Sequence, residues 1–400
     1  MRVFQVIVCL VLVVLGGYAN ASVHILPSAQ DYLLKTDLEL SSGQILAAGT
    51  QWYRAPDIER LRKELAAGTF AGDAKKGRLI LFGYGLVNNT YTTIGDGRKD
   101  GKPSLAEGKI INCTSCHGQS GTTPYAWPFF RTLTHFGLKE QGDRGEYFGG
   151  LGYHRDARLR ARDCGRECGS IVVIPTESFE MDALIAWITA VRDGVYPGEG
   201  ILIPAFKTLK DVAKIPGSRI PLFPNILEMK ADPVAGTEIF KNSCAGCHGE
   251  DGLGQWEDGV GFVFPPLAGS ASFSHAGGPF MIPVGAAFIK HQMPLTSPGA
   301  LTDQEALNVM AYVATLPRDS VWWQTYYFQH SPCSRPPYLP LNVGAIPKGF
   351  PFSAEQAQFG PWKPIADWLA SDTCKNLNPS STPSLGEGFE VNKSKKHRVK

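Results

Sequence analysis

The chain has 400 residues, and its 39 lysines and arginines nearly balance its 37 aspartates and glutamates. This balance argues against a nucleic-acid-binding protein, which would need a strongly basic surface. The length allows two or three domains with their own hydrophobic cores, and the 44 glycines and 29 prolines indicate many loops and extended segments.

The N-terminus has the pattern of an export signal. Arg2 precedes an apolar run from residue 3 to 15, and an Ala-Asn-Ala sequence follows at 19–21. The run is shorter than the roughly 20 residues that a membrane span needs, so we prefer a cleaved signal to an uncleaved anchor. Residues 1–21 are therefore predicted to be a signal peptide, and the mature protein is expected to be soluble and periplasmic.

Two copies of a Cys-x-x-Cys-His motif, each followed by glycine, organise the rest of the chain. Their members are Cys113, Cys116 and His117 in the first copy and Cys244, Cys247 and His248 in the second. Two thiols at this spacing can each form a thioether with a haem vinyl group, and the adjacent histidine can then bind the iron. A redox dithiol beside an unrelated histidine would explain one copy but is a poor explanation of two. We therefore predict two covalently bound haem c groups, with His117 and His248 as the proximal iron ligands.

Helical patterns flank both motifs, as in small cytochromes c. Before the second motif, residues 235–240 are expected to form a helix that leads into it, and a capping box at 302–305 starts the helix that closes this unit before Pro317. The first unit closes on a helix capped near Ser178, with an apolar stripe that starts at Met181.

We predict a mostly α-helical fold of two cytochrome c-type haem domains in tandem, with a loop-rich C-terminal extension. A short amphipathic helix is expected near residues 55–65, and spaced prolines mark an interdomain linker. The predicted segments after the signal are an N-terminal leader at 22–75, the first haem domain at 76–195, the linker at 196–233, the second haem domain at 234–317, and the extension at 318–400, disordered after about residue 379.

The distal ligand of the second haem is predicted to be Met293. It lies 45 residues after His248 and just ahead of the closing helix, where a thioether can reach the iron. Met281, in the same loop, is the competing ligand, and Met310 falls on the apolar face of the closing helix and is expected in the core. His275 and His291 are further alternatives, which we interpret as surface or supporting residues.

The first haem has no such methionine, because Met181 lies on the buried stripe of the closing helix. The remaining candidates for its distal side are His135, His154, Cys164, Cys168 or an open position. Arginines surround Cys164, and neighbouring positive charge lowers the pKa of a thiol and favours the thiolate that binds iron. A Cys164–Cys168 disulfide and bis-histidine ligation through His154 remain alternatives. Cys333 and Cys374 lie in the loop-rich extension and are predicted to form a disulfide.

The chain resembles the thiosulfate dehydrogenases, dihaem cytochromes c that join two thiosulfates into tetrathionate. The resemblance covers about residues 75–317, and its most specific element is the Arg-x-x-x-Cys sequence of Arg160 and Cys164. The matching segments are 83–90, 113–117, 160–164, 244–248, 265–269, 288–295 and 301–305. Cys168 and the long extension depart from the family pattern.

This resemblance implies that Cys164 is the axial ligand of an active-site haem and that Arg160 helps to hold the substrate. The family uses a second, upstream arginine, whose position here stays open among Arg131, Arg144, Arg155 and Arg158. Arginines suit a small sulfur dianion. Because thiolate ligation lowers a haem potential and His/Met ligation raises it, electrons are expected to leave through the second haem. The implied partner is a soluble or membrane-associated acceptor cytochrome.

Two other classes of protein compete with this enzyme. An electron-transfer cytochrome c without its own substrate would need only two saturated haems, and its arginines at 155–166 would form a docking or solvated face. A SoxA-like sulfur-oxidation subunit also uses a cysteine-ligated haem but would work with a partner chain. A dihaem peroxidase is supported by the haem count alone.

Overall fold

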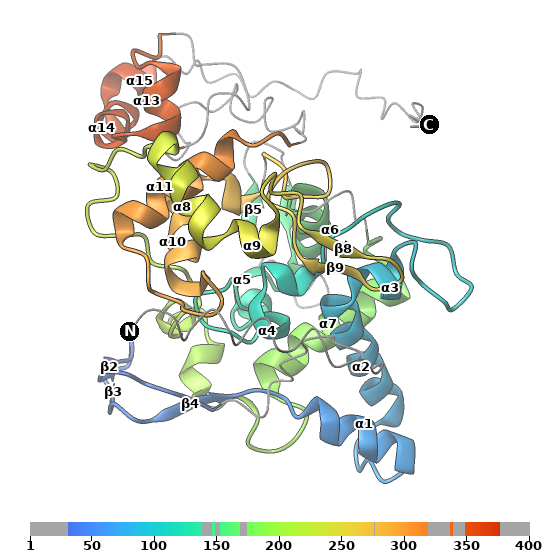
Figure 1. Ribbon diagram of the computed structural model, residues 1–400. Coiled ribbons are helices and arrows are strands. Elements are labelled where there is room, and N and C mark those ends of the chain that lie inside the picture. The colour runs from blue at the N-terminus through green and yellow to red at the C-terminus, as the bar shows by residue number, and fades with distance from the viewer. Residues whose placement is uncertain are drawn as a thin grey trace, which may run out of the picture.

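The computed structural model describes residues 31–137, 146–148, 153–168, 174–275, 277–318, 337–338 and 349–376. Helices dominate, and only short strands accompany them (Figure 1). The predicted signal peptide at 1–21 and the predicted disorder after about residue 379 lie outside these residues. Among the described helices, none is long and apolar enough to cross a membrane.

The leader segment forms small antiparallel sheets and one helix. Strand β4 (Gln51–Arg54) pairs with β1 (Asp31–Leu33) on one side and with β7 (Gly200–Ile201), far along the chain, on the other. Strands β2 (Leu38–Glu39) and β3 (Ile45–Leu46) form a second pair. Helix α1 (Ile58–Ala67) matches the expected amphipathic helix near residues 55–65, and Asp57 is its N-cap.

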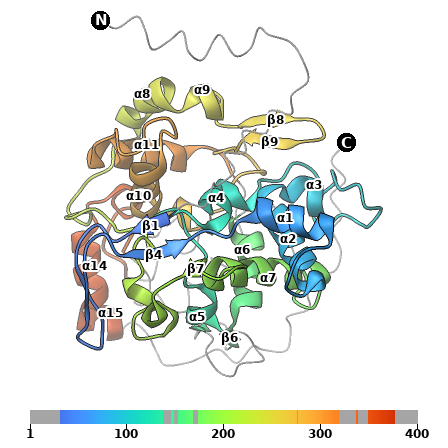
Figure 2. The ribbon, with the colours of Figure 1, turned by 90° about the horizontal axis from the view of Figure 1, so that it is seen from below.

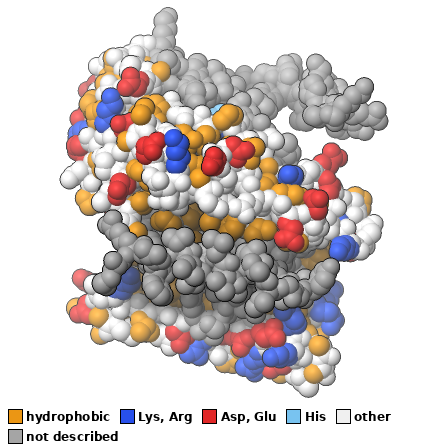
Figure 3. Space-filling view, in the orientation of Figure 1, with side chains coloured by type: hydrophobic (Ala, Val, Ile, Leu, Met, Phe, Trp, Pro, Cys, Tyr) orange, Lys and Arg blue, Asp and Glu red, His pale blue; other side chains and the backbone are white. Residues whose placement is uncertain are grey.

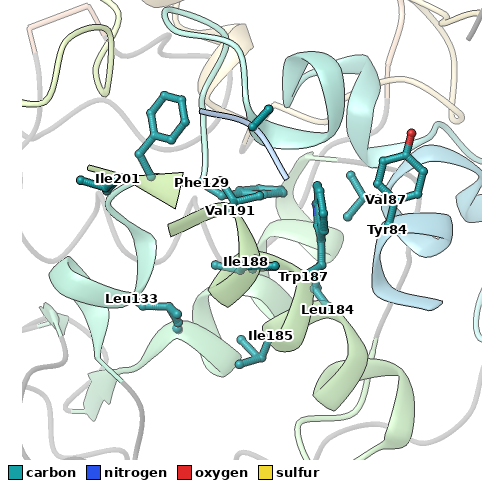
Figure 4. Close-up of a cluster of buried hydrophobic side chains, with 14 of the residues drawn as sticks. Tyr84, Val87, Phe129, Leu133, Leu184, Ile185, Trp187, Ile188, Val191 and Ile201 are labelled. Atoms are coloured by element: carbon teal, nitrogen blue, oxygen red, sulfur yellow. The ribbon is translucent and has the colours of Figure 1, made fainter. Parts of the chain in front are cut away.

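The first hydrophobic core forms where α2 (Ala74–Asn88) crosses α7 (Phe179–Asp193). Gly83 allows this close approach, because a Cβ there would lie 1.9 Å from the carbonyl oxygen of Ala183. Tyr84 and Trp187 pack edge to face beside the crossing, with ring centroids 5.1 Å apart (Figure 4). The predicted cap is confirmed: the Ser178 hydroxyl accepts a hydrogen bond from the Met181 amide, and Met181 itself is buried.

Short elements lie between these two helices in the sequence and surround the first motif. They are α3 (Thr90–Ile94), a 3-10 turn (Cys113–Ser115), α4 (Gly118–Gly121), α5 (Thr132–Phe136), the strand pair β5 (Glu146–Phe148) and β6 (Tyr153–Arg155), and α6 (Ala157–Cys168). Residues 89–112 separate the end of α2 from the motif, whereas helix α8 ends directly before the second motif.

The proline-spaced segment after α7 crosses from the first core to a second one. Phe206, Val212 and Ile215 are buried in the first core, whereas Phe223 and Ile226 are buried in the second. The segment is therefore packed along most of its length, although it carries only β7 and two 3-10 turns.

The second core repeats the helix crossing of the first. Here α8 (Pro233–Ser243) crosses α11 (Asp303–Thr315), and a Cβ on Gly236 would lie 2.0 Å from the carbonyl oxygen of Asn308. The other elements of this unit are α9 (Ala245–His248), β8 (Gln255–Glu257), β9 (Gly261–Phe264) and α10 (Ile282–Gln292). The capping box of Thr302 and Glu305 is present with both of its hydrogen bonds, as predicted.

Two views show how these units lie in space. Helices α8, α10 and α11 form one group, and α1, α2 and α7 form another (Figures 1 and 2). The short helix α4, directly after the first motif, lies between the two groups. On the face in Figure 3, lysine and arginine side chains are interspersed with acidic ones, as the balanced composition implies.

The C-terminal extension was expected to be rich in loops, but residues 354–376 are mostly helical. They form α13 (Ala354–Phe359), α14 (Lys363–Ala370) and α15 (Asp372–Asn376). Ile365 and Leu369 lie one turn apart on α14, and both are buried in the second core with Trp362. The extension therefore packs against the unit of the second motif, because its apolar side chains complete that core.

Candidate functional site: two motif turns and helix α6

The thiols of the first motif lie on a tight turn beside α2 and α3. The Thr90 hydroxyl accepts a hydrogen bond from the Cys113 amide at 3.0 Å and donates to the carbonyl oxygen of Leu86 at 2.8 Å. Removal from water raises the pKa of Cys113 to about 11 and that of Cys116 to about 12. Both side chains are therefore neutral thiols, the form that carries the hydrogen needed for addition to a vinyl group.

The imidazole of His117 is held by the main chain that follows it. Its Nδ1 lies 2.5 Å from the carbonyl oxygen of Trp127, and its ring packs against Phe129 with centroids 4.6 Å apart. A carbonyl oxygen can only accept, so Nδ1 carries the hydrogen and Nε2 keeps a lone pair for a metal. Such an outer hydrogen bond is typical of a ligating histidine.

The second motif has the same arrangement. Nδ1 of His248 lies 2.7 Å from the carbonyl oxygen of Pro265, and the side chain is buried, which lowers its pKa. Burial also raises the pKa of the Cys244 thiol to about 11. In both copies, two thiols and one histidine with a free Nε2 thus lie together, and this donor set fits a covalently attached haem.

No group of three or more histidine, cysteine or acidic side chains in the described parts of the chain is arranged to hold a metal ion.

Helix α6 brings Cys164 close to the first motif. The negative charge of a Cys164 thiolate is one of the causes that raise the pKa of both Cys113 and Cys116, so the three sulfur atoms lie near one another. Cys164 is a half-exposed thiol and does not form the Cys164–Cys168 disulfide that was one alternative. The side chain of Cys168, at the end of α6, lies outside the described residues.

The arginines near Cys164 divide into two kinds. Arg158 donates to the carbonyl oxygen of Thr176 and to Asp182, at 2.8 and 2.6 Å, and Arg162 pairs with Asp163 at 2.9 Å. Arg158 thus connects α6 to the segment that starts α7, whereas the pair of Arg162 is local to α6. Arg160 is half-buried and lies four residues before Cys164, so both residues are on one face of the helix.

Among the candidates for a second substrate arginine, Arg158 is thus already engaged in structural contacts. Arg131 is half-buried at the start of α5, which packs against α6. Arg144 and the side chain of Arg155 lie outside the described residues, as does the side chain of His154. His135 is half-buried on α5, where its ring contacts Phe136 edge to face.

For the second haem, the two competing methionines lie at opposite ends of one helix. Met281 is the N-cap of α10 and Met293 is its C-cap. Met310 is buried against α10, as predicted for a core residue. The ring of His291 stacks on Tyr125 and that of His275 contacts Phe280.

Cys374 is disulfide-bonded. Cys333, its predicted partner, lies outside the described residues, so the pairing of these two cysteines stays a prediction.

Several residues of the site were not identified from the sequence. Trp127 and Pro265 act through main-chain carbonyls, which no side-chain pattern reveals, and Phe288 acts across the boundary between the two units. Pro265 and Phe288 lie in two of the matched segments of the family resemblance, 265–269 and 288–295, whereas Trp127 lies in none of them.

Comparisons with known proteins match this chain to cytochrome c and to thiosulfate dehydrogenases. A family model described as Cytochrome c matches residues 233–317, which contain the second motif. The thiosulfate dehydrogenase of Psychrobacter arcticus is 27% identical over 250 residues, 62% of this chain and 65% of that protein. The enzyme of Stutzerimonas stutzeri is 26% identical over 310 residues, covering 77% and 84%, and that of Allochromatium vinosum is 25% identical over 292 residues, covering 72% and 96%.

A solved structure supports the fold. The thiosulfate dehydrogenase TsdBA of Marichromatium purpuratum aligns with a TM-score of 0.50 at 24% identity, over 65% of this chain and 52% of that one. The family match identifies residues 233–317 as a cytochrome c domain, a type of domain that binds haem c covalently, and the hydrogen-bonded His248 lies within it. The chain is therefore similar to thiosulfate dehydrogenases, which are oxidoreductases.

Proposed function

We propose that the chain is a dihaem cytochrome c that oxidises thiosulfate to tetrathionate. The observation that carries the proposal is the position of Cys164 on α6, close enough to the first motif for a charge on its sulfur to raise the pKa of both Cys113 and Cys116. A thiol from a separate helix beside a haem-attachment turn is what a thiolate-ligated haem requires. The relatives named thiosulfate dehydrogenase supply the substrate class.

In this proposal, His117 and Cys164 are the ligands at the first site, and His248 and Met293 are those at the second. The bound haems supply one-electron acceptors whose electrons pass on to an external acceptor cytochrome. Two thiosulfate dianions join through one new S–S bond to give one tetrathionate dianion. The reaction releases two electrons, which the haems would accept, and it neither consumes nor releases protons. In both motifs the histidine is oriented by a hydrogen bond from its Nδ1 to a main-chain carbonyl, and this repetition supports the presence of two haems.

In this proposal, cationic side chains of the protein would compensate the negative charge of the two thiosulfate ions. Two thiosulfate dianions repel one another, so their approach needs fixed cations near Cys164. Arg160 lies one helical turn from Cys164 and is half-buried. A guanidinium in that position can donate two parallel hydrogen bonds to a sulfonate group and lower the repulsion. Arg158 ties α6 to α7 through Asp182, whereas Arg162 pairs with its neighbour Asp163 within α6.

We also infer that the chain is exported and works in the periplasm. The support is the charged start, short apolar run and Ala-Asn-Ala sequence of its first 21 residues. Covalent haem attachment, for which the motif thiols are suited, fits an exported protein.

The test uses the mature, haem-loaded chain with anaerobic thiosulfate. We expect rapid appearance of the reduced-haem spectrum and formation of one tetrathionate for every two electrons stored. Arg160→Ala should weaken this reduction, whereas Arg60→Ala, which removes an exposed cation of the distant helix α1, should leave it intact. Reduction by generic donors alone would show that the protein is an electron carrier without its own substrate. Reduction only after a second subunit is added would point to the SoxA-like alternative.

A further inference from the structure

Residues 124–127, directly after the first motif, lie between that motif and helix α10 of the second unit. The Tyr125 amide donates to the carbonyl oxygen of Gly217 at 2.8 Å, and the Gly118 amide donates to that of Ala126 at 3.2 Å. Tyr125 and Trp127 both have left-handed backbones, with φ of 64° and 44°. Bulky L-residues rarely adopt this conformation, which persists only where the surroundings impose it.

The surroundings that impose it are on α10. The indole of Trp127 stacks on the ring of Phe288, with centroids 4.5 Å apart and planes 8° from parallel. Tyr125 stacks on His291 in the same way, at 4.7 Å and 15°. The side-chain amide Nε2 of Gln292 also donates to the carbonyl oxygen of Pro124 at 3.2 Å.

These contacts come from one face of α10. Phe288, His291 and Gln292 are related by i, i+3 and i+4 spacing, so they point in one direction. Met293 follows them immediately as the C-cap of the helix. A shift of α10 would therefore move the aromatic contacts and the Met293 position together.

Trp127 connects this face to the first motif. Its carbonyl oxygen accepts the Nδ1 hydrogen of His117, and the orientation of that carbonyl depends on the same backbone conformation that the ring stacking maintains. If the indole were released, the strained peptide could rotate towards an ordinary conformation. The carbonyl would then turn away from His117.

We propose that Trp127 is a positioning residue shared by the two haem sites, and that its stacking on Phe288 sets the orientation and basicity of His117. The inference rests on the proposed function, in which both histidines bind haem. An outer hydrogen bond of this kind orients a ligand and tunes its donor strength. A residue of the second unit, Phe288, thereby acts on the haem ligand of the first.

The test compares Phe288→Ala with Phe288→Tyr, which keeps an aromatic ring. The matched control is Phe179→Ala, which removes an aromatic pair with Phe82 from α7, where Phe179 is 47% exposed. The readouts are haem content, ferric EPR spectra and midpoint potentials, with the two haem signals assigned beforehand through Cys164→Ala and Met293→Leu.

We expect Phe288→Ala to shift the EPR g values and the potential of the haem bound by His117, and Phe288→Tyr to restore them towards wild type. Phe179→Ala should leave both unchanged. If Phe288→Ala binds two haems and the signal of the haem at His117 does not shift, the inference about Trp127 is overturned, whereas the proposed function is unaffected. A wild-type protein that binds a single haem would overturn the proposed function first. Should Phe288→Ala not fold, Trp127→Ala against Trp127→Phe provides the same comparison, since both keep the main-chain carbonyl.

Discussion

Gly83 of α2 and Ala183 of α7 meet backbone to backbone: a Cβ on Gly83 would lie 1.9 Å from the Ala183 carbonyl oxygen. Gly236 and Asn308 repeat this contact in the second unit at 2.0 Å. In both cases the residue one turn further along the closing helix is aromatic, Trp187 or Tyr312, and its Cβ also lies against the glycine. Each motif is therefore held between helices that cross at a glycine.

Gly83→Ala should destabilise the protein because the helices would have to separate. We expect a loss of about 2–3 kcal/mol in the free energy of unfolding, the upper part of the range for overpacking. The control is Gly85→Ala in the same helix, where the nearest atom to a new Cβ is 3.9 Å away. That change should be neutral or stabilising by up to about 1 kcal/mol, because alanine favours helix. Equal denaturation midpoints for both variants would contradict the crossing geometry.

Thr90 is predicted to be a buried anchor of the first motif. Thr90→Val removes the acceptor of the Cys113 amide and the donor to Leu86. An unsatisfied buried group costs about 1–3 kcal/mol, which chemical unfolding would detect. Thr90→Ser keeps the hydroxyl and should retain most of the stability. If the valine variant were as stable as the serine variant, the hydroxyl would not be anchoring the turn.

The ion pair of Arg98 and Asp100 should appear in the acid stability of the protein. Arg98, whose side chain is 4% exposed, lowers the pKa of Asp100 to about 2, chiefly by hydrogen bonding. Because the unfolded carboxyl has a pKa of about 4, the unfolded chain binds a proton that the folded chain does not. The stabilisation is therefore complete above about pH 4–5 and is lost as the pH falls towards about 2.

Thermal unfolding of wild type and Asp100→Asn between about pH 6 and about pH 2 measures this effect. The difference between their melting temperatures should be constant at the higher pH and should shrink across the acid range. A difference that does not change with pH would rule out a depressed pKa for Asp100.

The choice between Met293 and Met281 can be decided from their positions on α10. Twelve residues of helix place them about 18 Å apart, so only one of them could be the distal ligand of the haem proposed at His248. We expect Met293→Leu to abolish the weak long-wavelength absorption that a thioether ligand gives to ferric haem, and Met281→Leu to retain it. The opposite result would exchange the two assignments.

The helices and motif positions could be predicted from the sequence because they depend on local patterns. The capping box at Thr302 and the cap at Ser178 were confirmed, since each is a bond between near neighbours in the chain. The helices of the extension were missed, because α13 and α14 are short and are stable only when Trp362 and Ile365 are buried in the second core.

Only part of the candidate site could be predicted from the sequence, because the rest depends on contacts between residues that are distant in the chain. Side-chain ligands such as His117 carry a motif, whereas the carbonyl of Trp127 and the ring of Phe288 gain their roles from contacts between residues far apart in the chain. Arg158 was a candidate for binding substrate, and its hydrogen bonds to Thr176 and Asp182 became visible only in the folded chain.

The proposed function depends most on Cys164 as the thiolate ligand of the haem proposed at His117. The most direct measurement is the EPR spectrum of the ferric, haem-loaded protein in wild type, Cys164→Ala and Cys168→Ala. We expect the wild-type EPR spectrum to contain the signal of a thiolate-ligated ferric haem. This signal should disappear in Cys164→Ala and remain in Cys168→Ala. A wild-type spectrum without this signal, or its loss only in Cys168→Ala, would contradict the assignment.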